Sequence, residues 1–358
     1  MKPLRSVAVL AALLAACSRS SAPQGPAEVQ VATDLTPGMV DTALAQIARN
    51  GGPRGERVAG MQAGVSALPG AAGAPVGNAE RQPAPQAAGD VRWDAEPYGA
   101  IAAAAKGELL PAPQSANDVP PLWKDPTGTW VAVGGRAVVL LVATGQMGAQ
   151  GVPVRFTALT EPRLKGKVAL PSPTGGMALA HFAALYAAWG AERMGAWLKQ
   201  LQANEPQLYA NDDEVRQAVV SGRAAVGMLS SDEAAKAAAS AAHVEIVYPN
   251  QKSIGTFVWP TALSIPKSAR NPEAARLLAE RLADRTIEQL LVARVPGYLP
   301  LRAGIPVPPG VNSAANLVVV SVDPARIVFE IGERKAALAA WAASMPRASP
   351  RGAQVQAK

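Results

Sequence analysis

The sequence of 358 residues is poor in the side chains that most often perform chemistry. It contains one cysteine, Cys17, and two histidines, His181 and His243. A single cysteine cannot close a disulfide within the chain, and two histidines cannot build the Cys/His clusters of structural zinc sites. The motifs H-E-x-x-H, G-x-G-x-x-G and G-x-x-x-x-G-K-[ST] are also missing. These absences exclude zincin-type proteases and the commonest nucleotide-binding enzymes.

Long apolar runs and basic runs are scarce as well. The longest apolar stretch near the N-terminus, Val7–Ala16, rises about 15 Å as a helix, roughly half of a bilayer core. Aromatic residues make up 4% of the chain, and the net charge of +7 is spread along it without a basic, aromatic-rich segment. We therefore expect no nucleic-acid partner, and we interpret the charge as surface solvation with a weak bias toward anionic ligands.

The N-terminus carries the pattern of a secretory signal. Lys2 and Arg5 precede the apolar run, which ends in Leu14-Ala15-Ala16-Cys17, a resemblance to a bacterial lipobox. The resemblance implies cleavage before Cys17 and a lipid on its sulfur, which would anchor the protein in a membrane. The alternative is a plain signal peptide with an incidental cysteine. We expect residues 1–16 to be the signal peptide and 17–27 to be a polar, Pro/Gly-containing tether.

The remaining chain is long enough for two lobes. Strand and helix patterns alternate, which predicts an α/β fold with largely parallel sheets. Strands are expected at 28–32, 90–93, 130–142, 167–170, 223–229, 244–248 and 256–265; helices at 39–51, 97–106, 195–203, 211–221, 271–287 and 323–343. A long helix with Leu179, Phe182, Tyr186 and Trp189 on one face is expected after Gly176, and an Ala-rich helix is expected to open at 230–233. Residues 53–89 are rich in Gly, Pro and Ala, and we expect a poorly ordered loop there.

Candidate site residues lie where expected strands end and helices begin, the usual ligand-binding edge of an α/β sheet. They form four loops: Thr33-Asp34; Trp93 and Asp94 with Glu96; Thr174-Gly175-Gly176; and Ser230-Ser231-Asp232. The Thr174 loop can present free N–H groups at a helix start to an anion, although a simple helix cap is the alternative. Ser230–Glu233 matches the capping box S-x-x-E.

Arg136 is the one charge in the otherwise apolar run Trp130–Val142. A buried arginine needs either a carboxylate of the fold or an anionic ligand, and the sequence leaves both open. The glycine pair Gly134-Gly135 in the same run indicates a bend or a close backbone approach. His181 lies beside an inward-facing residue, Phe182, and we expect it to be packed rather than a ligand.

Several long stretches resemble one family in order along the chain. They include DVRWDAEP at 90–97, the hinge-like stretch KGELLPAPQSANDVPPLWKDPTGTWVAVGGRAVVLLV, LTEPRLKGKVALPSPTGGMALAHFAALYAAWG at 159–190 and EVRQAVVSGRAAVGMLSSDEA at 214–234. The chain resembles bacterial periplasmic solute-binding proteins of the ferric-iron-binding type. The resemblance implies a two-lobed type 2 periplasmic-binding-protein fold that closes on a ligand and delivers it to an ABC permease. The expected lobes are 28–133 with about 250–300, and 134–249 with about 301–345, followed by a tail at 346–358.

The ligand is the point on which this chain differs from the family pattern. Iron-binding members coordinate Fe(III) with tyrosines, commonly an adjacent pair, where this chain has Ser230-Ser231, and none of its five tyrosines are adjacent. The leading hypothesis is therefore a lipid-anchored, monomeric receptor for a small anion (a phosphonate, phosphate ester or organic acid) or a metal–anion complex, without a cofactor. The alternatives are a ferric-iron receptor, a degenerate binding or sensor module, and a hydrolase on the same scaffold.

Overall fold

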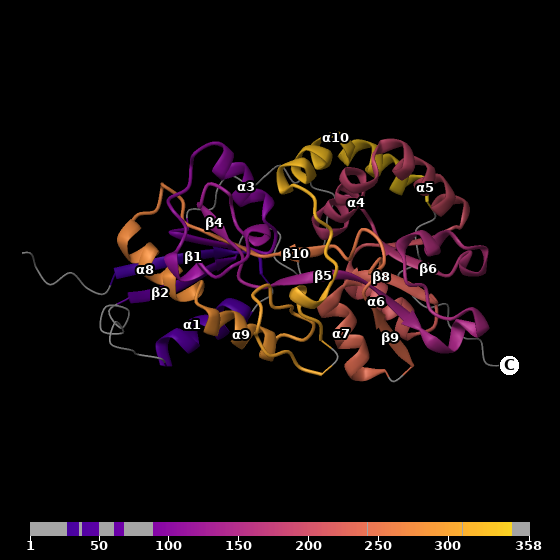
Figure 1. Cartoon of the computed structure of the whole chain (residues 1–358), viewed down its shortest axis with the longest axis horizontal. Coiled ribbons are helices and arrows are strands. Elements are labelled where there is room, and N and C mark those ends of the chain that lie inside the picture. Colours follow the sequence, from indigo (N-terminus) through magenta and orange to yellow (C-terminus); the bar gives the residue numbers. More distant parts are fainter. Residues whose placement is uncertain are drawn as a thin grey trace, which may run out of the picture.

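The computed structural model describes residues 27–35, 38–49, 61–67, 89–241, 243–309 and 311–345. The expected signal peptide, Cys17 and the tail at 346–358 lie outside the described residues. Two lobes, each with its own β-sheet, lie side by side along the long axis (Figure 1). The expected two-lobed α/β architecture is thus confirmed.

The first lobe is built on a five-stranded sheet. Its strand order is β2 (Met61–Ala67), β1 (Ala27–Thr33), β3 (Val91–Asp94), β11 (Ala262–Ser264) and β4 (Trp130–Val131). The helices are α1 (Met39–Arg49), α3 (Tyr98–Ala105), α8 (Pro272–Leu282) and α9 (Arg285–Arg294). Helix α8 packs on β1 and β3, whereas α3 packs on β4 and β11. Neighbouring residues of β11 point to these different faces: Leu263 enters the main core and Ala262 a smaller one under α3.

The second lobe is built on a six-stranded sheet. β10 (Val258–Pro260), β5 (Gly135–Ala143), β8 (Val226–Ser230), β6 (Val168–Pro171) and β7 (Gln207–Tyr209) follow in that order, and β9 (Val244–Val247) also pairs with β5. The helices are α4 (Gly176–Trp189), α5 (Ala191–Ala203), α6 (Asp212–Val220), α7 (Ser231–Ser240) and α10 (Pro324–Ala343). Helix α10 packs along α4, and α6 and α7 pack on β5 and β8.

Strand β5 is covered on both faces, which explains its nearly unbroken hydrophobic sequence. Val138, Leu140 and Val142 belong to the core under α4 and α10. Val139 and Leu141 point the other way, into a core that continues into the first lobe. This continuous core ties the lobes together beneath the cleft.

Three segments carry the chain between the lobes: the stretch between β4 and β5, the stretch between β10 and β11, and the stretch between α9 and α10. Gly134 has φ +70°, and a Cβ on Gly135 would lie 2.6 Å from the backbone oxygen of Trp259. The close backbone approach indicated by this glycine pair is therefore confirmed. The expected single strand at 256–265 is wrong, because β10 and β11 belong to different sheets on either side of the buried Thr261.

Other differences from the sequence-based expectations concern strand pairing. β2 forms inside the segment expected to be a poorly ordered loop, because its backbone pairs in parallel with β1 despite a low strand propensity. The sheets are mixed rather than largely parallel, since β5 and β11 run antiparallel to their neighbours. The helix expected at 271–287 is two helices, because Asp284 ends the first and caps the second.

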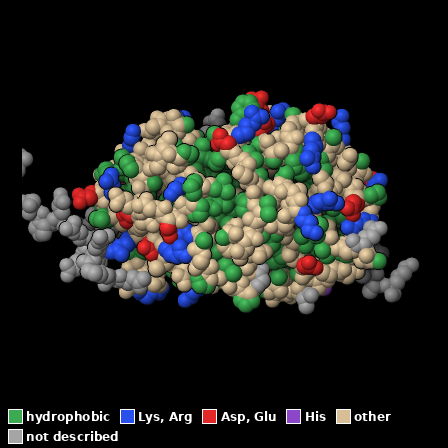
Figure 2. Space-filling view, viewed as in Figure 1, with side chains coloured by type: hydrophobic (Ala, Val, Ile, Leu, Met, Phe, Trp, Pro, Cys, Tyr) green, Lys and Arg blue, Asp and Glu red, His purple; other side chains and the backbone are tan. Residues whose placement is uncertain are grey.

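Positive and negative side chains are interspersed over the face shown in Figure 2, as the spread of charge along the sequence indicates. Within the part of the chain that the structure describes, no helix has both the length and the apolar character to span a bilayer.

Candidate functional site

A small cavity of about 30 Å³ lies where the two lobes meet. Its walls come from Asp34, Leu35, Met39, Ala95, Arg136, Asp232, Val295 and Tyr298. Asp34 and Ala95 follow strands β1 and β3 of the first lobe, whereas Arg136 and Asp232 come from β5 and α7 of the second. Three of the residues expected at the site, Asp34, Arg136 and Asp232, are thus brought together from distant parts of the sequence.

Arg136 is held only loosely by the fold. Its Nη2 donates to the backbone oxygen of Ala95 at 3.4 Å, and its Nη1 lies 4.0 Å from Oδ2 of Asp232. Strong hydrogen bonds from nitrogen to oxygen fall between about 2.7 and 3.2 Å, so both contacts are long. The Arg136 side chain is 19% exposed. Its guanidinium therefore retains donors for a further acceptor in the cleft.

Asp232 lies in the first turn of α7, where the helix dipole favours a negative charge. The residue is 8% exposed, and its Oδ1 atom has no hydrogen-bond partner among the described residues. A buried carboxylate oxygen without a partner is costly unless something binds it. The opposite carboxylate, Asp34, accepts a hydrogen bond at 2.5 Å from the backbone nitrogen of Ala95.

The Thr174-Gly175-Gly176 loop does not line the cavity, but it lies beside a carboxylate of the other lobe. All three residues are exposed, and the N-cap of α4 is Gly175, so the interpretation of Thr174 as the cap is wrong. Because Gly175 has no side chain, the N-cap residue itself cannot cap this helix. A Cβ on Gly176 would lie 3.6 Å from Oε1 of Glu96, which places the Glu96 carboxylate next to the start of α4.

Two of the remaining expected site residues bond within the first lobe. The Thr33 hydroxyl donates to the backbone oxygen of Trp93 at 2.7 Å. Trp93 is fully buried, and its indole nitrogen donates to the hydroxyl of Thr261. Neither side chain lines the cavity.

Asp94 lies beneath the start of α3, beside Arg92. Its Oδ1 accepts from Arg92 at 3.1 Å, and its Oδ2 has no partner among the described residues. Burial raises the pKa of the Asp94 carboxyl to about 6, while the charge of Arg92 opposes this rise. Asp94 does not line the cavity, although it lies only one residue from Ala95.

Ser230 and Ser231 are both buried and support the loop rather than facing the cavity. Ser231 donates to the backbone oxygen of Gly297 at 2.6 Å and accepts from the backbone nitrogen of Ala137 at 3.0 Å. The backbone nitrogen of Ser230 donates to Asp212, and Ser230 makes no side-chain cap within the described chain. The expected capping box at 230–233 is therefore wrong, because Asp212 engages this residue instead. Burial raises the pKa of Asp212 to about 6.

Tyr298 is the one tyrosine that lines the cavity, and the sequence analysis did not place it there. Its hydroxyl donates to the backbone oxygen of Val133 at 2.5 Å, and burial raises its pKa, which disfavours a phenolate. A Cβ on the preceding Gly297 would lie 2.1 Å from the Ser231 oxygen. In the sequence, the only signal for the approach of Gly297 to Ser231 is a glycine next to an aromatic residue. That signal does not show which distant residue the glycine approaches.

The other tyrosines and His181 lie outside the cavity lining. Tyr98 packs edge-to-face on Trp259 with ring centroids 4.7 Å apart, and Arg334 lies 5.0 Å above the ring of Tyr186. His181 is fully buried against Phe156, as expected of a packed histidine, and burial lowers its pKa to about 3. The described residues contain no group of three or more His, Cys, Asp or Glu placed to hold a metal ion.

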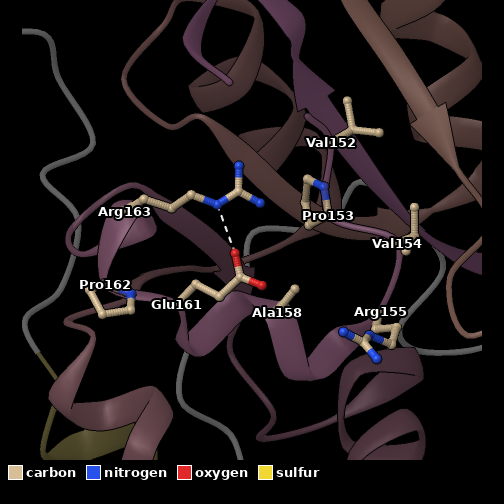
Figure 3. A pocket seen from close by; sticks show the side chains of 8 residues that line it. All are labelled: Val152, Pro153, Val154, Arg155, Ala158, Glu161, Pro162 and Arg163. Atoms are coloured by element: carbon tan, nitrogen blue, oxygen red, sulfur yellow. Dashed lines mark hydrogen bonds and ion pairs between the residues drawn. The ribbon is translucent and has the colours of Figure 1, made fainter. Parts of the chain in front are cut away.

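A larger hollow, about 630 Å³, lies on the second lobe and is lined only by residues 152–163 (Figure 3). Two of its polar side chains are paired with each other: Arg163 donates to Glu161 at 2.7 Å and also to the backbone oxygen of Gly151 at 2.8 Å. No residue of the four candidate loops lines it. Volume alone therefore does not make it the functional site.

A comparison with protein families shows the family of this chain. A model of bacterial extracellular solute-binding proteins matches residues 103–323, which include Arg136, the α4 start and Asp232. The chain belongs to this family. Its members are binding proteins, and the family gives no support to the hydrolase alternative.

Individual relatives are more distant. The chain is 30% identical over 206 residues to iron uptake protein A1 of Synechocystis sp., a match that covers 54% of this chain and 56% of the relative. It is 29% identical over 136 residues to an uncharacterized protein of Haemophilus influenzae, or 38% of each chain. The chain thus spans about half or less of the curated relatives it matches.

Solved structures share the whole architecture. Iron-bound HitA from Pseudomonas aeruginosa has a TM-score of 0.70 at 18% identity, and the match covers 87% of this chain and 99% of HitA. Trichodesmium FutA in complex with iron and citrate has a TM-score of 0.67 at 18% identity, with 88% and 98% covered. At such low identity these similarities show the fold alone.

Proposed function

We propose that the protein is the solute receptor of an ABC importer for iron, and that it takes the metal as a complex with a small organic anion. The observation that carries the proposal is the composition of the interlobe cavity. Two carboxylates, Asp34 and Asp232, face it together with one guanidinium, Arg136. Such a site carries more negative than positive charge, so it favours a cargo that brings a cation.

The three groups have distinct tasks in this proposal. Carboxylate oxygens suit a hard cation such as Fe(III), and Oδ1 of Asp232 is buried and has no partner among the described residues. The planar fork of Arg136 suits a carboxylate of the accompanying anion, because arginine binds carboxylates through two parallel hydrogen bonds. The cavity of about 30 Å³ has room for about one water molecule, so the lobes would part before the complex enters, and metal and anion would then meet opposite walls of the site.

The site does not suit iron without its anion. Ser230 and Ser231 are buried and engaged with the backbone, and the hydroxyl of Tyr298 is bonded to Val133. Two carboxylates leave most positions around an octahedral metal unfilled. A chelating anion supplies the missing oxygens.

The relatives support iron over the metal-free anion of the leading sequence hypothesis. One curated relative is named an iron uptake protein, and one similar structure holds iron together with citrate. A complex of iron with citrate would contain the metal named for the curated relative and an anion whose carboxylates Arg136 can bind.

The test is isothermal titration calorimetry with ferric citrate, citrate alone and an iron salt in a weak buffer. We expect ferric citrate to bind much more tightly than citrate, and Asp232→Asn to weaken ferric citrate more than citrate. Asp213→Asn is the matched control, since Asp213 lies in the first turn of α6 and is not part of the cavity lining. A red-brown protein that loses its colour in Tyr98→Phe or Tyr248→Phe would instead show direct phenolate ligation.

A second candidate is a receptor for a metal-free phosphonate, phosphate ester or organic acid. The observation that favours it is the start of α4, where the exposed Gly175 and Gly176 have no side chains of their own to cap the helix. Tight binding of such an anion in the presence of a metal chelator would favour this candidate over iron.

We further propose that the receptor works as a monomer in the periplasm or on the outer face of the cell membrane. The lipobox-like sequence before Cys17 supports a lipid anchor, and the family supports delivery of the ligand to an inner-membrane permease. Closure of the lobes around the ligand would present the loaded form to that permease.

A further inference from the structure

The turn between β3 and α3 bridges the two lobes above the cavity. We define its residues Ala95–Tyr98 as the interlobe strap. The strap is fixed to the first lobe by the hydrogen bond from the Ala95 nitrogen to Asp34. From there it makes three separate contacts with the second lobe.

The first contact uses the backbone of the strap. The carbonyl oxygen of Ala95 accepts a hydrogen bond from Arg136 at 3.4 Å. The Ala95 oxygen thus occupies Nη2 of Arg136, a donor that would bind the anion of the cargo in the proposed function.

The second contact uses the carboxylate of Glu96. It lies at the start of α4, 3.6 Å from where a Cβ on Gly176 would be. Helix α4 has 14 residues, no acidic residue in its first turn, and a glycine, Gly175, as its N-cap residue. Glu96 therefore supplies, from the other lobe, the negative charge that a helix N-terminus favours.

The third contact is aromatic. Tyr98 packs on Trp259 of β10, which is buried in the second lobe, and it also contacts the hydrophobic core of that lobe. This contact fixes the strap to the second lobe through apolar packing, in addition to the charged contact of Glu96 with the start of α4. It does not depend on the charge of Glu96, so the strap can remain in place while the carboxylate is displaced.

We infer that the strap is an internal substitute for the cargo anion and that Glu96 is a specificity-determining residue. In the ligand-free protein it engages both Arg136 and the start of α4, and so holds the lobes together. An anion must displace the Glu96 carboxylate to reach α4, which disfavours weakly charged anions. The role given to the cargo rests on the proposed function, whereas the effect on the ligand-free lobes does not.

The test compares Glu96→Gln with Glu192→Gln. Glu192 lies in the first turn of α5, whose N-cap is also a glycine without a side-chain cap in the described chain, and it is exposed. Spin labels on Lys106→Cys and Lys199→Cys, exposed residues of the first and second lobes, report the interlobe distance. The full chain with Cys17→Ser provides a background without other cysteines. Citrate and ferric citrate affinities are measured on the same variants.

We expect Glu96→Gln to lengthen the interlobe distance of the ligand-free protein and to tighten citrate binding about two- to thirty-fold, the range for one charge at a helix terminus. Glu192→Gln should change neither. An unchanged distance in Glu96→Gln, an equal change in Glu192→Gln, or weaker citrate binding in Glu96→Gln would overturn the inference. A longer distance in a protein that binds no ferric citrate would support the strap and refute the proposed cargo.

Discussion

Replacing Arg136 by alanine should separate binding from folding. In the ligand-free protein its two polar contacts are long, 3.4 and 4.0 Å, and the side chain is partly exposed. Contacts of this kind contribute about 1 kcal/mol or less, so Arg136→Ala should lower the melting temperature by only a few degrees. After the substitution, the negative charge of Asp232 is still stabilised by the dipole at the start of α7, which limits the loss of stability.

The loss on binding should be larger. If the guanidinium makes two charge-assisted hydrogen bonds to the cargo, each worth about 1.5 kcal/mol at the low end, the variant loses about 3 kcal/mol. That corresponds to a Kd raised more than about 100-fold. Calorimetric titration with ferric citrate measures the change, and thermal unfolding without ligand measures the stability of the same sample.

Arg163→Ala is the matched control. Its side chain is 21% exposed, close to the 19% of Arg136, and it also binds a carboxylate and a backbone oxygen, but it lines the hollow on the second lobe. It should leave the affinity unchanged. An Arg136→Ala protein that melts ten or more degrees lower, yet binds ferric citrate as tightly as the parent, would show that Arg136 is a structural residue and refute the reasoning.

Three further predictions address the anchor, the fold and its pH dependence. Cys17→Ser should move the protein from the membrane fraction to the soluble fraction and remove the mass of the lipid; an unchanged mass and location would contradict the lipobox interpretation. Glu288→Ala should cost about 3–5 kcal/mol in chemical unfolding, because it leaves the fully buried Arg302 with only the half-exposed Asp118 as its partner carboxylate. Asp94 has a folded pKa of about 6 against 3.8 unfolded, so the folded state binds more protons between these values and stability should fall as pH rises from 4 to 6, by roughly 3 kcal/mol for this group. Asp94→Asn should flatten that part of the stability curve, and an unaltered curve would contradict the assignment.

Local signals in the sequence were sufficient for much of the fold. Asn211 and Asn271 were placed at helix starts, and both side chains accept hydrogen bonds from backbone nitrogens three residues later. The apolar run of β5 and the glycine pair before it likewise marked a buried strand next to a close crossing. Each of these features depends on residues within a few positions of one another, which is why a single sequence can reveal them.

Long-range pairing was not accessible in the same way. β2 pairs in parallel with β1, which lies far from it in the sequence, and the 256–265 segment divides between two sheets because each half finds a different partner strand. The resemblance to a family indicated two lobes but not where the chain crosses between them. Thr261, which bonds to Val133 and Trp93 at that crossing, is unremarkable in the sequence.

The candidate site was likewise predictable where it depends on local sequence and not where it depends on how the two lobes meet. Rules for strand ends placed Asp34, Asp232 and Glu96 at the correct edges of their sheets, but strand ends also hold residues that only support the loop, as Ser231 and Thr33 do. What separates the two groups is the direction of each side chain relative to the opposite lobe. Because that direction depends on how the lobes meet, Glu96 can be recognised beside α4 only once both lobes are placed. Because of this dependence, the interlobe distance tests how the site opens, and the titrations with citrate and ferric citrate test what it binds.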